Sequence, residues 1–168
     1  MPVTAGRNNR RDDREGENGL KLPAIPPVIF GIPMVLGALV HAYVWSGDIF
    51  GTVIGLVAGI FLIAVGLWLI YWTWITMRAH GEHPEPDRPT ETLVTGGPFK
   101  RTRNPIYVGF LLIGAGVAIS LNAMAMLIAA LVGVVALTVL VIRKEEAYLE
   151  RKFGEVYRTY VSNTRRWL

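Results

Sequence analysis

A basic run rich in glycine and proline, Thr95–Gly109 (TGGPFKRTRNPIYVG), carries the first side chains that could do chemistry. Asn104 is a suitable N-cap for a helix that begins at the proline after it. The first amides of a helix lack backbone partners and carry a partial positive charge. Because Lys100, Arg101 and Arg103 lie beside these amides, the run predicts a site that binds an anion, either a carboxylate or a phosphate.

A second charged stretch, Arg143–Tyr157, contains the adjacent glutamates Glu145 and Glu146. Consecutive residues on a helix point about 100° apart, so the two carboxylates should have different partners. We expect one to pair with Arg103 or Arg143 while the other faces a ligand. A carboxylate without a partner near hydrocarbon would be costly, and it therefore finds a cation or becomes protonated. The alternative is that the two glutamates only cap the end of an apolar helix.

Long apolar segments must position these groups. Of the 168 residues, 52% are hydrophobic and 18% are charged, and the apolar residues form runs without Asp, Glu, Lys or Arg. A helix needs about 20 apolar residues to cross a bilayer, and the third run is long enough to cross twice. We therefore predict an all-α, polytopic membrane protein with four transmembrane helices and a cytoplasmic C-terminal helix over 143–162. The predicted spans are about 24–45, 49–77, 105–121 and 123–142.

The distribution of the 17 Lys and Arg residues predicts the orientation. Five precede the first span, five lie between the second and third, and seven follow the fourth. The other two connections contain none, so the positive-inside rule places both termini in the cytoplasm, with the cytoplasmic membrane as the expected location. Residues 1–22 are expected to be a disordered tail and 23–168 a single membrane domain. Anionic lipids account for the pI of 9.6, and no nucleic-acid partner is needed.

Cysteine is absent, which excludes disulfides, a thiol nucleophile and thiolate metal sites. His80 and His83, together with Glu82 and Glu85, superficially resemble a metal motif. They lie in a proline-broken stretch, 78–100, without the i, i+4 spacing of a zinc-binding helix. We therefore predict a solvated loop there and no metal.

Small residues recur at four-residue spacing in the second predicted span, at Gly51, Gly55 and Gly59. Such spacing lets two helix backbones approach closely. We expect packing against a neighbouring span of the same chain. A dimer interface is the alternative, and the oligomeric state stays open.

Aromatic residues gather where membrane interfaces are expected. The cluster Trp68, Tyr71, Trp72 and Trp74 is typical of an interface, although it could instead stack on a ligand. At the end of the chain, the segment 165–168 (RRWL) is expected to be an interfacial anchor.

The two charged stretches together resemble the isoprenylcysteine carboxyl methyltransferase and phospholipid methyltransferase superfamily. The first block is LVTGGPFKRTRNPIYVG over 93–109, and the second is EEAYLERKFGEVYRTY over 145–160. They occur in the family's order and are separated by a helical hairpin. Members of the family are helical membrane enzymes that use S-adenosylmethionine, so the resemblance implies this cofactor.

The resemblance also implies which residues form the site. Arg103, Asn104 and Tyr107 match the R-[HN]-P-x-Y element, and Gly114 and Gly116 match a G-x-G element near the cofactor. The paired glutamates match an element implicated in cofactor binding, and Tyr157 matches the closing F-G-x-x-Y-x-x-Y pattern. The expected catalytic residues are Arg103, Asn104 and Glu146. The expected cofactor-binding residues are Tyr107, Gly109, Gly114, Gly116, Arg143, Glu145, Glu146 and Tyr157.

The expected reaction is methyl transfer to a lipophilic small molecule or lipid that enters from the bilayer, while the cofactor enters from the cytoplasm. The acceptor is either an isoprenylcysteine-type carboxylate or a phospholipid amine. A carboxylate needs no general base, whereas an amine must lose a proton, for which Glu146 is the candidate. Two other functions stay open: a sterol-type membrane reductase that uses NADPH, and a membrane protein without catalytic activity.

Overall fold

The computed structural model describes residues 26–45, 52–82 and 90–168, so the predicted tail, 1–22, lies outside the described residues. Within these ranges the chain is helical, apart from one isolated parallel bridge between Thr102 and Arg165. The short η1 is a 3₁₀-helix and η2 is a π-helix. The elements are α2 (Pro26–Tyr43), α3 (Thr52–Ala79), η1 (Gly97–Lys100), α4 (Pro105–Ser120), α5 (Met124–Leu137), η2 (Thr138–Ile142), α6 (Arg143–Phe153) and α7 (Glu155–Asn163).

Three of these helices are long and apolar enough to cross a membrane, over 26–43, 53–79 and 124–153. They confirm an all-helical integral membrane protein. α4 is also apolar, but its 16 residues make only about 24 Å of helix, less than the roughly 30 Å of a bilayer core. Its start at Pro105 is the predicted one.

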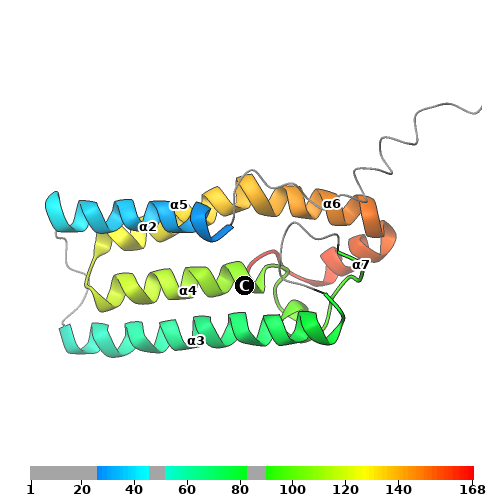
Figure 1. Ribbon diagram of the computed structural model, residues 1–168, viewed down its shortest axis with the longest axis horizontal. Helices are drawn as coiled ribbons and strands as arrows, with labels where there is room; N and C mark the ends of the chain where they lie inside the picture. Colours follow the sequence, from blue (N-terminus) through cyan, green and yellow to red (C-terminus); the bar gives the residue numbers. More distant parts are fainter. Residues whose placement is uncertain (1–25, 46–51, 83–89) are drawn as a thin grey trace, which may run out of the picture.

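α4 lies in the middle of the bundle, between α3 and α5, and α2 packs against α5 (Figure 1). Each of these helices runs antiparallel to the one before it. α5, η2 and α6 form one continuous helix of 30 residues, so the predicted boundary at 142 is a π-helical segment and not a break. Together with the 28 residues of α3, this helix extends past α2 and α4 at one end of the bundle. The functional groups gather at that end.

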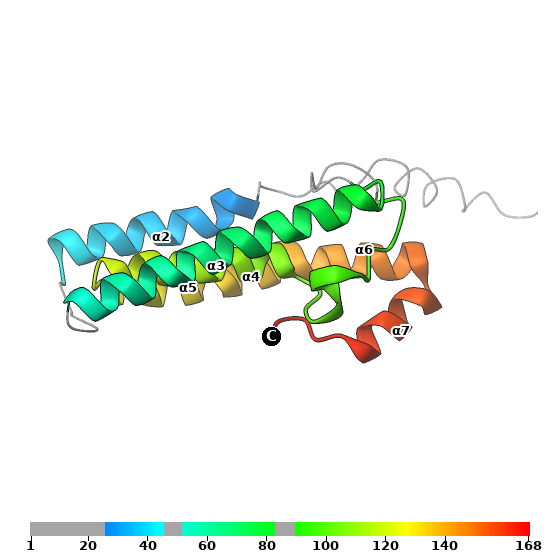
Figure 2. The same cartoon turned by 90° about the horizontal axis from the view of Figure 1, so that it is seen from below.

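The chain then turns back toward the bundle. Gly154 has a φ of 52°, a conformation that favours glycine, and it separates α6 from α7. In both views α7 turns away from the end of α6, and the chain ends beside the start of α4 (Figure 2). The predicted single helix over 143–162 is therefore two helices.

Glycines allow α3 and α4 to pack closely. A Cβ on Gly116 would lie 2.6 Å from the carbonyl oxygen of Gly59, and a Cβ on Gly66 would lie 2.8 Å from that of Gly109. This confirms that Gly59 packs against a neighbouring helix of the same chain.

We expect Gly59→Ala to lower the thermal stability of the detergent-purified protein. Its added methyl group would overlap Ser120 and Gly116, and overpacking of this kind costs about 1–3 kcal/mol. Gly31→Ala is the matched control, because nothing described lies within 4 Å of a Cβ at that position. Equal melting temperatures for the two variants would contradict this account of the α3–α4 contact.

Candidate active site

A cavity of about 490 Å³ lies at the end of the bundle where α3 and α6 extend beyond the other helices. Its volume is in the range of small-molecule sites. Of the described residues, those with charged side chains in its wall are Glu82, Arg103, Glu145 and Glu146. Most of the remaining wall is apolar or aromatic, formed by Pro26, Pro27, Ile70, Trp74, Met77, Leu93, Val94, Phe99, Ile106, Tyr107, Phe110, Tyr148, Leu149, Tyr157 and Tyr160.

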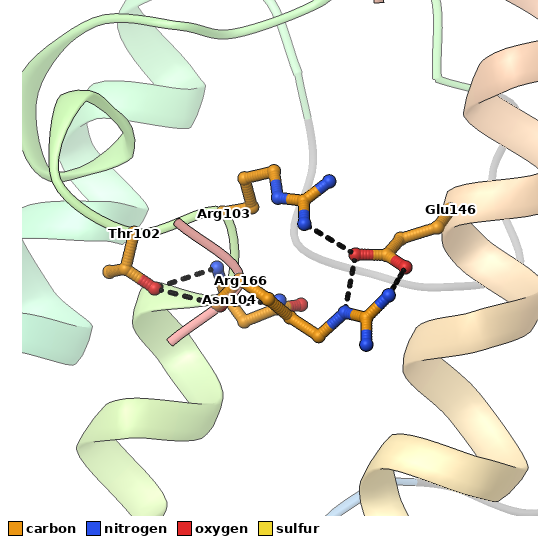
Figure 3. Close-up of polar contacts among 5 residues, drawn as sticks. All are labelled: Thr102, Arg103, Asn104, Glu146 and Arg166. Carbon is orange, nitrogen blue, oxygen red and sulfur yellow. Dashed lines mark hydrogen bonds and ion pairs between the residues drawn. The ribbon is translucent and has the colours of Figure 1, made fainter. Parts of the chain in front are cut away.

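The Glu146 carboxylate is held by two arginines. Arg166 Nε donates to Glu146 Oε1 at 2.9 Å and Arg166 Nη2 to Oε2 at 2.7 Å, a two-point contact. Arg103 Nη2 lies 3.3 Å from Glu146 Oε1. Figure 3 shows both guanidinium groups pointing toward this carboxylate. The Arg103 and Glu146 side chains are only 12% and 17% exposed, so the predicted pairing of one glutamate with Arg103 is confirmed.

The last residues of the chain hold the start of α4. The backbone amide of Arg103 donates to the carbonyl oxygen of Arg165 at 2.9 Å. The carbonyl oxygen of Arg166 accepts from Thr102 Oγ1 at 3.1 Å and from Asn104 Nδ2 at 2.9 Å. Trp167 packs against the apolar core cluster that includes Tyr107 and Ile142. The segment 165–168, predicted only as an interfacial anchor, therefore also supports the site through its contacts with the start of α4 and with Glu146.

Asn104 lines the cavity but does not cap α4 as the sequence predicts. It occupies the N-cap position of α4, but its side chain makes no capping hydrogen bond. Its amide binds the C-terminal segment instead. The buried Asn104 thereby fixes Arg103, its neighbour in sequence, against Glu146.

Glu145 faces a different partner from Glu146, as the helical spacing predicts. Its Oε1 accepts a hydrogen bond from the phenol of Tyr107 at 2.9 Å, and this bond joins α6 to the first turn of α4. No Lys, Arg or His in the described part of the chain forms an ion pair with Glu145. Of the two α6 carboxylates in the cavity wall, Glu146 is therefore neutralised by arginines and Glu145 is supported only by a neutral phenol.

Arg103 retains donors for a ligand. Its Nε is buried and has no hydrogen-bond partner among the described residues. The guanidinium uses Nη2 for Glu146 and also makes a hydrogen bond with the phenol of Tyr157, which leaves Nε unused. A buried guanidinium with unused donors in a cavity wall is suited to bind a carboxylate or a phosphate.

α7 adds two tyrosines to the wall of the cavity. Tyr157 is 3% exposed, and burial together with the charge of Glu146 raises the pKa of its phenol, although the nearby Arg103 opposes this shift. The Tyr160 hydroxyl donates to the carbonyl oxygen of Phe99 at 2.8 Å and so holds α7 against η1. Both phenols therefore keep their protons at neutral pH.

Four residues predicted to bind the cofactor lie outside the cavity wall. Gly109 and Gly116 contact α3, and Gly114 packs against the Phe30 ring of α2, so the structure assigns these glycines to helix packing. Arg143 is exposed and does not line the cavity. Lys100 and Arg101 are also exposed, so of the three basic residues beside α4 only Arg103 reaches the site.

Sequence reasoning missed Arg166 and Glu82 as residues of the site, and it gave Trp74 a place beside a ligand only as an alternative. The sequence pattern predicts a membrane surface for Arg166. The signal that could have found its role is the need of a buried glutamate for a cation partner. Trp74 lines the cavity beneath the guanidinium of Arg78, which lies 3.7 Å from the ring centroid. Glu82 is buried and accepts a hydrogen bond from the amide of Thr92. The predicted solvated loop is therefore wrong at its described ends, because they fold over the cavity.

His83 and Glu85 of the weak metal motif lie outside the described residues. Among the described residues, no group of three or more His, Cys, Asp or Glu side chains could hold a metal ion.

Comparison with known proteins gives a family but no individual relative. No curated protein and no solved structure matches the chain. A model of the family described as phospholipid methyltransferase matches residues 54–156, which is more than half of the chain. The match runs from α3 into α7 and includes Arg103, Glu145 and Glu146. The chain therefore belongs to the phospholipid methyltransferase family and is a membrane methyltransferase.

Proposed function

We propose that the protein moves a methyl group from S-adenosylmethionine to the amine of a membrane lipid. The observation that carries the proposal is the division of charge in the cavity. One arginine with unused donors faces the cavity, and so do carboxylates without a cation partner, at the end of a bundle of membrane-length helices.

The residues present fit the cofactor. Arg103 has donors free for its carboxylate, and the aromatic rings of Trp74, Tyr157 and Tyr160 offer faces to its cationic and adenine parts. Glu82, buried beside Thr92, is suited to its ammonium group. S-adenosylmethionine, when bound, supplies an electrophilic methyl group on its sulfonium. The protein residues orient the two reactants and exclude water, because alignment contributes much of the rate of such a displacement.

The charge of the cavity favours an amine over a carboxylate as the acceptor. Three glutamates and one arginine line it, and the arginine is assigned to the cofactor. A second anion would find no further cation among the described lining residues, whereas an amine would find Glu145. Ile106 and Phe110 continue the wall along α4 and would contact the lipid chains.

Glu145 is the group that would take up the proton of the amine. Its carboxylate is buried against the phenol of Tyr107 and has no cation partner among the described residues, so a positively charged acceptor or a proton would stabilise it. Glu146, the base expected from the sequence, has both oxygens bound by Arg166. Protonation of Glu146 would break that contact, so we assign Glu146 to the ion pairs with Arg166 and Arg103 and not to proton transfer.

For the membrane arrangement, we propose that 23–168 form one domain with four spans, α4 being the short one. The grouping of Lys and Arg before the first predicted span, between the second and third, and after the fourth supports a cytoplasmic orientation of the site and of both termini. The lipid would then enter from the bilayer and the cofactor from the cytoplasm.

We expect the detergent-purified protein to bind S-adenosylhomocysteine in a calorimetric titration. Arg103→Gln should weaken this binding about tenfold or more, because charge-assisted hydrogen bonds to the carboxylate are lost. Arg101→Gln, an exposed residue two positions away, is the matched control and should bind as the wild type does. Lack of binding to the wild type would refute the cofactor, and a titration with NADPH would then test the reductase.

The acceptor is tested with a labelled methyl donor. Vesicles that contain an ethanolamine phospholipid should yield a lipid labelled on nitrogen, while a prenylated cysteine analogue should stay unlabelled. A base-labile methyl ester on the prenylated cysteine, without label in the phospholipid, would assign the carboxylate as acceptor instead.

A further inference from the structure

The family match ends at residue 156, and Arg166 lies beyond it, outside the wall of the cavity. Arg166 nevertheless makes the shortest contacts to Glu146. We infer that Arg166 is a positioning residue that binds Glu146 in order to leave Arg103 available for the carboxylate of the cofactor. This inference rests on the proposed function.

Arg166 and Arg103 share the Glu146 carboxylate unequally. Arg166 occupies both of its oxygens, at 2.9 and 2.7 Å, whereas Arg103 reaches one oxygen at 3.3 Å. A planar guanidinium that binds both carboxylate oxygens matches their geometry and forms a stronger contact than a single hydrogen bond does. Hydrogen bonding to Glu146 also raises the pKa of Arg166. The contact of Glu146 with Arg166 is therefore closer and more complete than its contact with Arg103.

The charge of the three side chains leads to the same conclusion. Two guanidinium groups and one carboxylate leave one positive charge in excess, and Arg103 is the member of the trio that is buried in the cavity wall with an unused donor. Without Arg166, the carboxylate would rotate onto Arg103 and bind it at two points. The excess positive charge would then be gone, and two of the five N–H donors of Arg103 would be occupied by Glu146.

The C-terminal segment holds Arg166 in place for this task. Its carbonyl oxygen accepts hydrogen bonds from Thr102 and Asn104, the residues on either side of Arg103. Figure 3 shows these contacts beside the Glu146 carboxylate. Thr102 and Asn104 therefore fix both Arg103 and Arg166, the two arginines that compete for Glu146.

The test compares S-adenosylhomocysteine with its decarboxylated analogue, which keeps the amine and lacks the carboxylate. The measured quantity is the ratio of the two dissociation constants, because any contact to the amine or to adenine cancels in it. Wild-type protein should prefer the carboxylate form about tenfold or more. In Arg166→Gln the preference should nearly disappear, as in Arg103→Gln, although Arg166 does not touch the ligand.

The double variant Arg166→Gln/Glu146→Gln separates this role from a structural one. A neutral residue at 146 no longer competes for Arg103, so the preference for the carboxylate should return. Arg166→Lys, which keeps the charge but not the two-point contact, should give an intermediate ratio and serves if Arg166→Gln does not fold. Arg158→Gln is the matched control, because Arg158 pairs with Glu150 of α6 at the exposed surface.

The outcomes are distinct. A wild-type ratio in Arg166→Gln, or an equal loss of affinity for both ligands, would overturn the role of Arg166 while leaving the cofactor assignment intact. Failure of the double variant to recover the ratio would overturn the competition for Arg103. If wild-type protein binds neither ligand, the proposed function fails and this inference fails with it.

Discussion

Replacing Glu146 by alanine should have the largest effect on stability of any single substitution in the site. The change leaves Arg103 and Arg166 close together without their shared counter-ion. Removing one partner from a fully buried pair costs roughly 3–5 kcal/mol. Because the Arg166 side chain is 40% exposed, water would compensate part of this loss, and we expect about 2 kcal/mol or more. Thermal unfolding in detergent measures the change.

Glu150→Ala is the matched control for this substitution. Glu150 lies one helical turn further along α6 and binds Arg158 at 3.0 Å, but both side chains are more than half exposed. An exposed pair contributes about 0–1 kcal/mol, so this variant should melt close to the wild type. Similar melting temperatures for the two variants would mean that the Glu146 pair contributes no more than a surface contact.

The helices could be predicted from the sequence because their signal is local. Runs of apolar residues and the proline at 105 set the elements within a few residues of their observed bounds. The different directions of the Glu145 and Glu146 side chains follow from the period of a helix, and the structure gives the two carboxylates separate partners. Gly59 was likewise predicted to pack within the chain, because small residues at four-residue spacing are needed only where backbones approach closely.

The remaining features depend on contacts between residues distant in sequence. Nothing near Arg166 in the sequence indicates that the chain returns to Thr102, since this contact spans 64 residues. The roles of the motif glycines depend on distant contacts for a related reason. Their spacing suits either a ligand or a neighbouring helix, and only the contacts of α4 with α3 and with Phe30 of α2 distinguish the two. Asn104 has a cap-forming side chain, but a more distant carbonyl group competes for it.

The site combines residues of a long helix with a residue of a loop. The carboxylates lie on α6, which continues a membrane-length helix, while Arg103 lies on the loop before α4. Among the described residues, the C-terminal segment is the one that connects α6 with this loop through both side-chain and main-chain contacts. The position of Arg103 thus depends on the last residues of the chain, although they lie outside the region that the family model matches.

The second large effect is expected for Glu145→Gln, measured as methyl transfer to the ethanolamine phospholipid. Glutamine retains an oxygen that can accept from Tyr107, so the packing of α6 on α4 is preserved. It removes the negative charge and the basic oxygen that the amine requires. General bases contribute about 10²–10⁴-fold, and we expect turnover to fall about 100-fold or more.

Binding of S-adenosylhomocysteine separates this role from a role in holding the cofactor. If Glu145 serves the acceptor, the dissociation constant of Glu145→Gln should stay within about threefold of the wild type, a difference below 1 kcal/mol. Glu155→Gln, an exposed glutamate of α7, should leave both quantities unchanged. Loss of binding in parallel with turnover would reassign Glu145 to the cofactor. Unchanged turnover would instead assign the proton of the amine to Glu82. Glu82 is the other cavity carboxylate without a cation partner among the described residues.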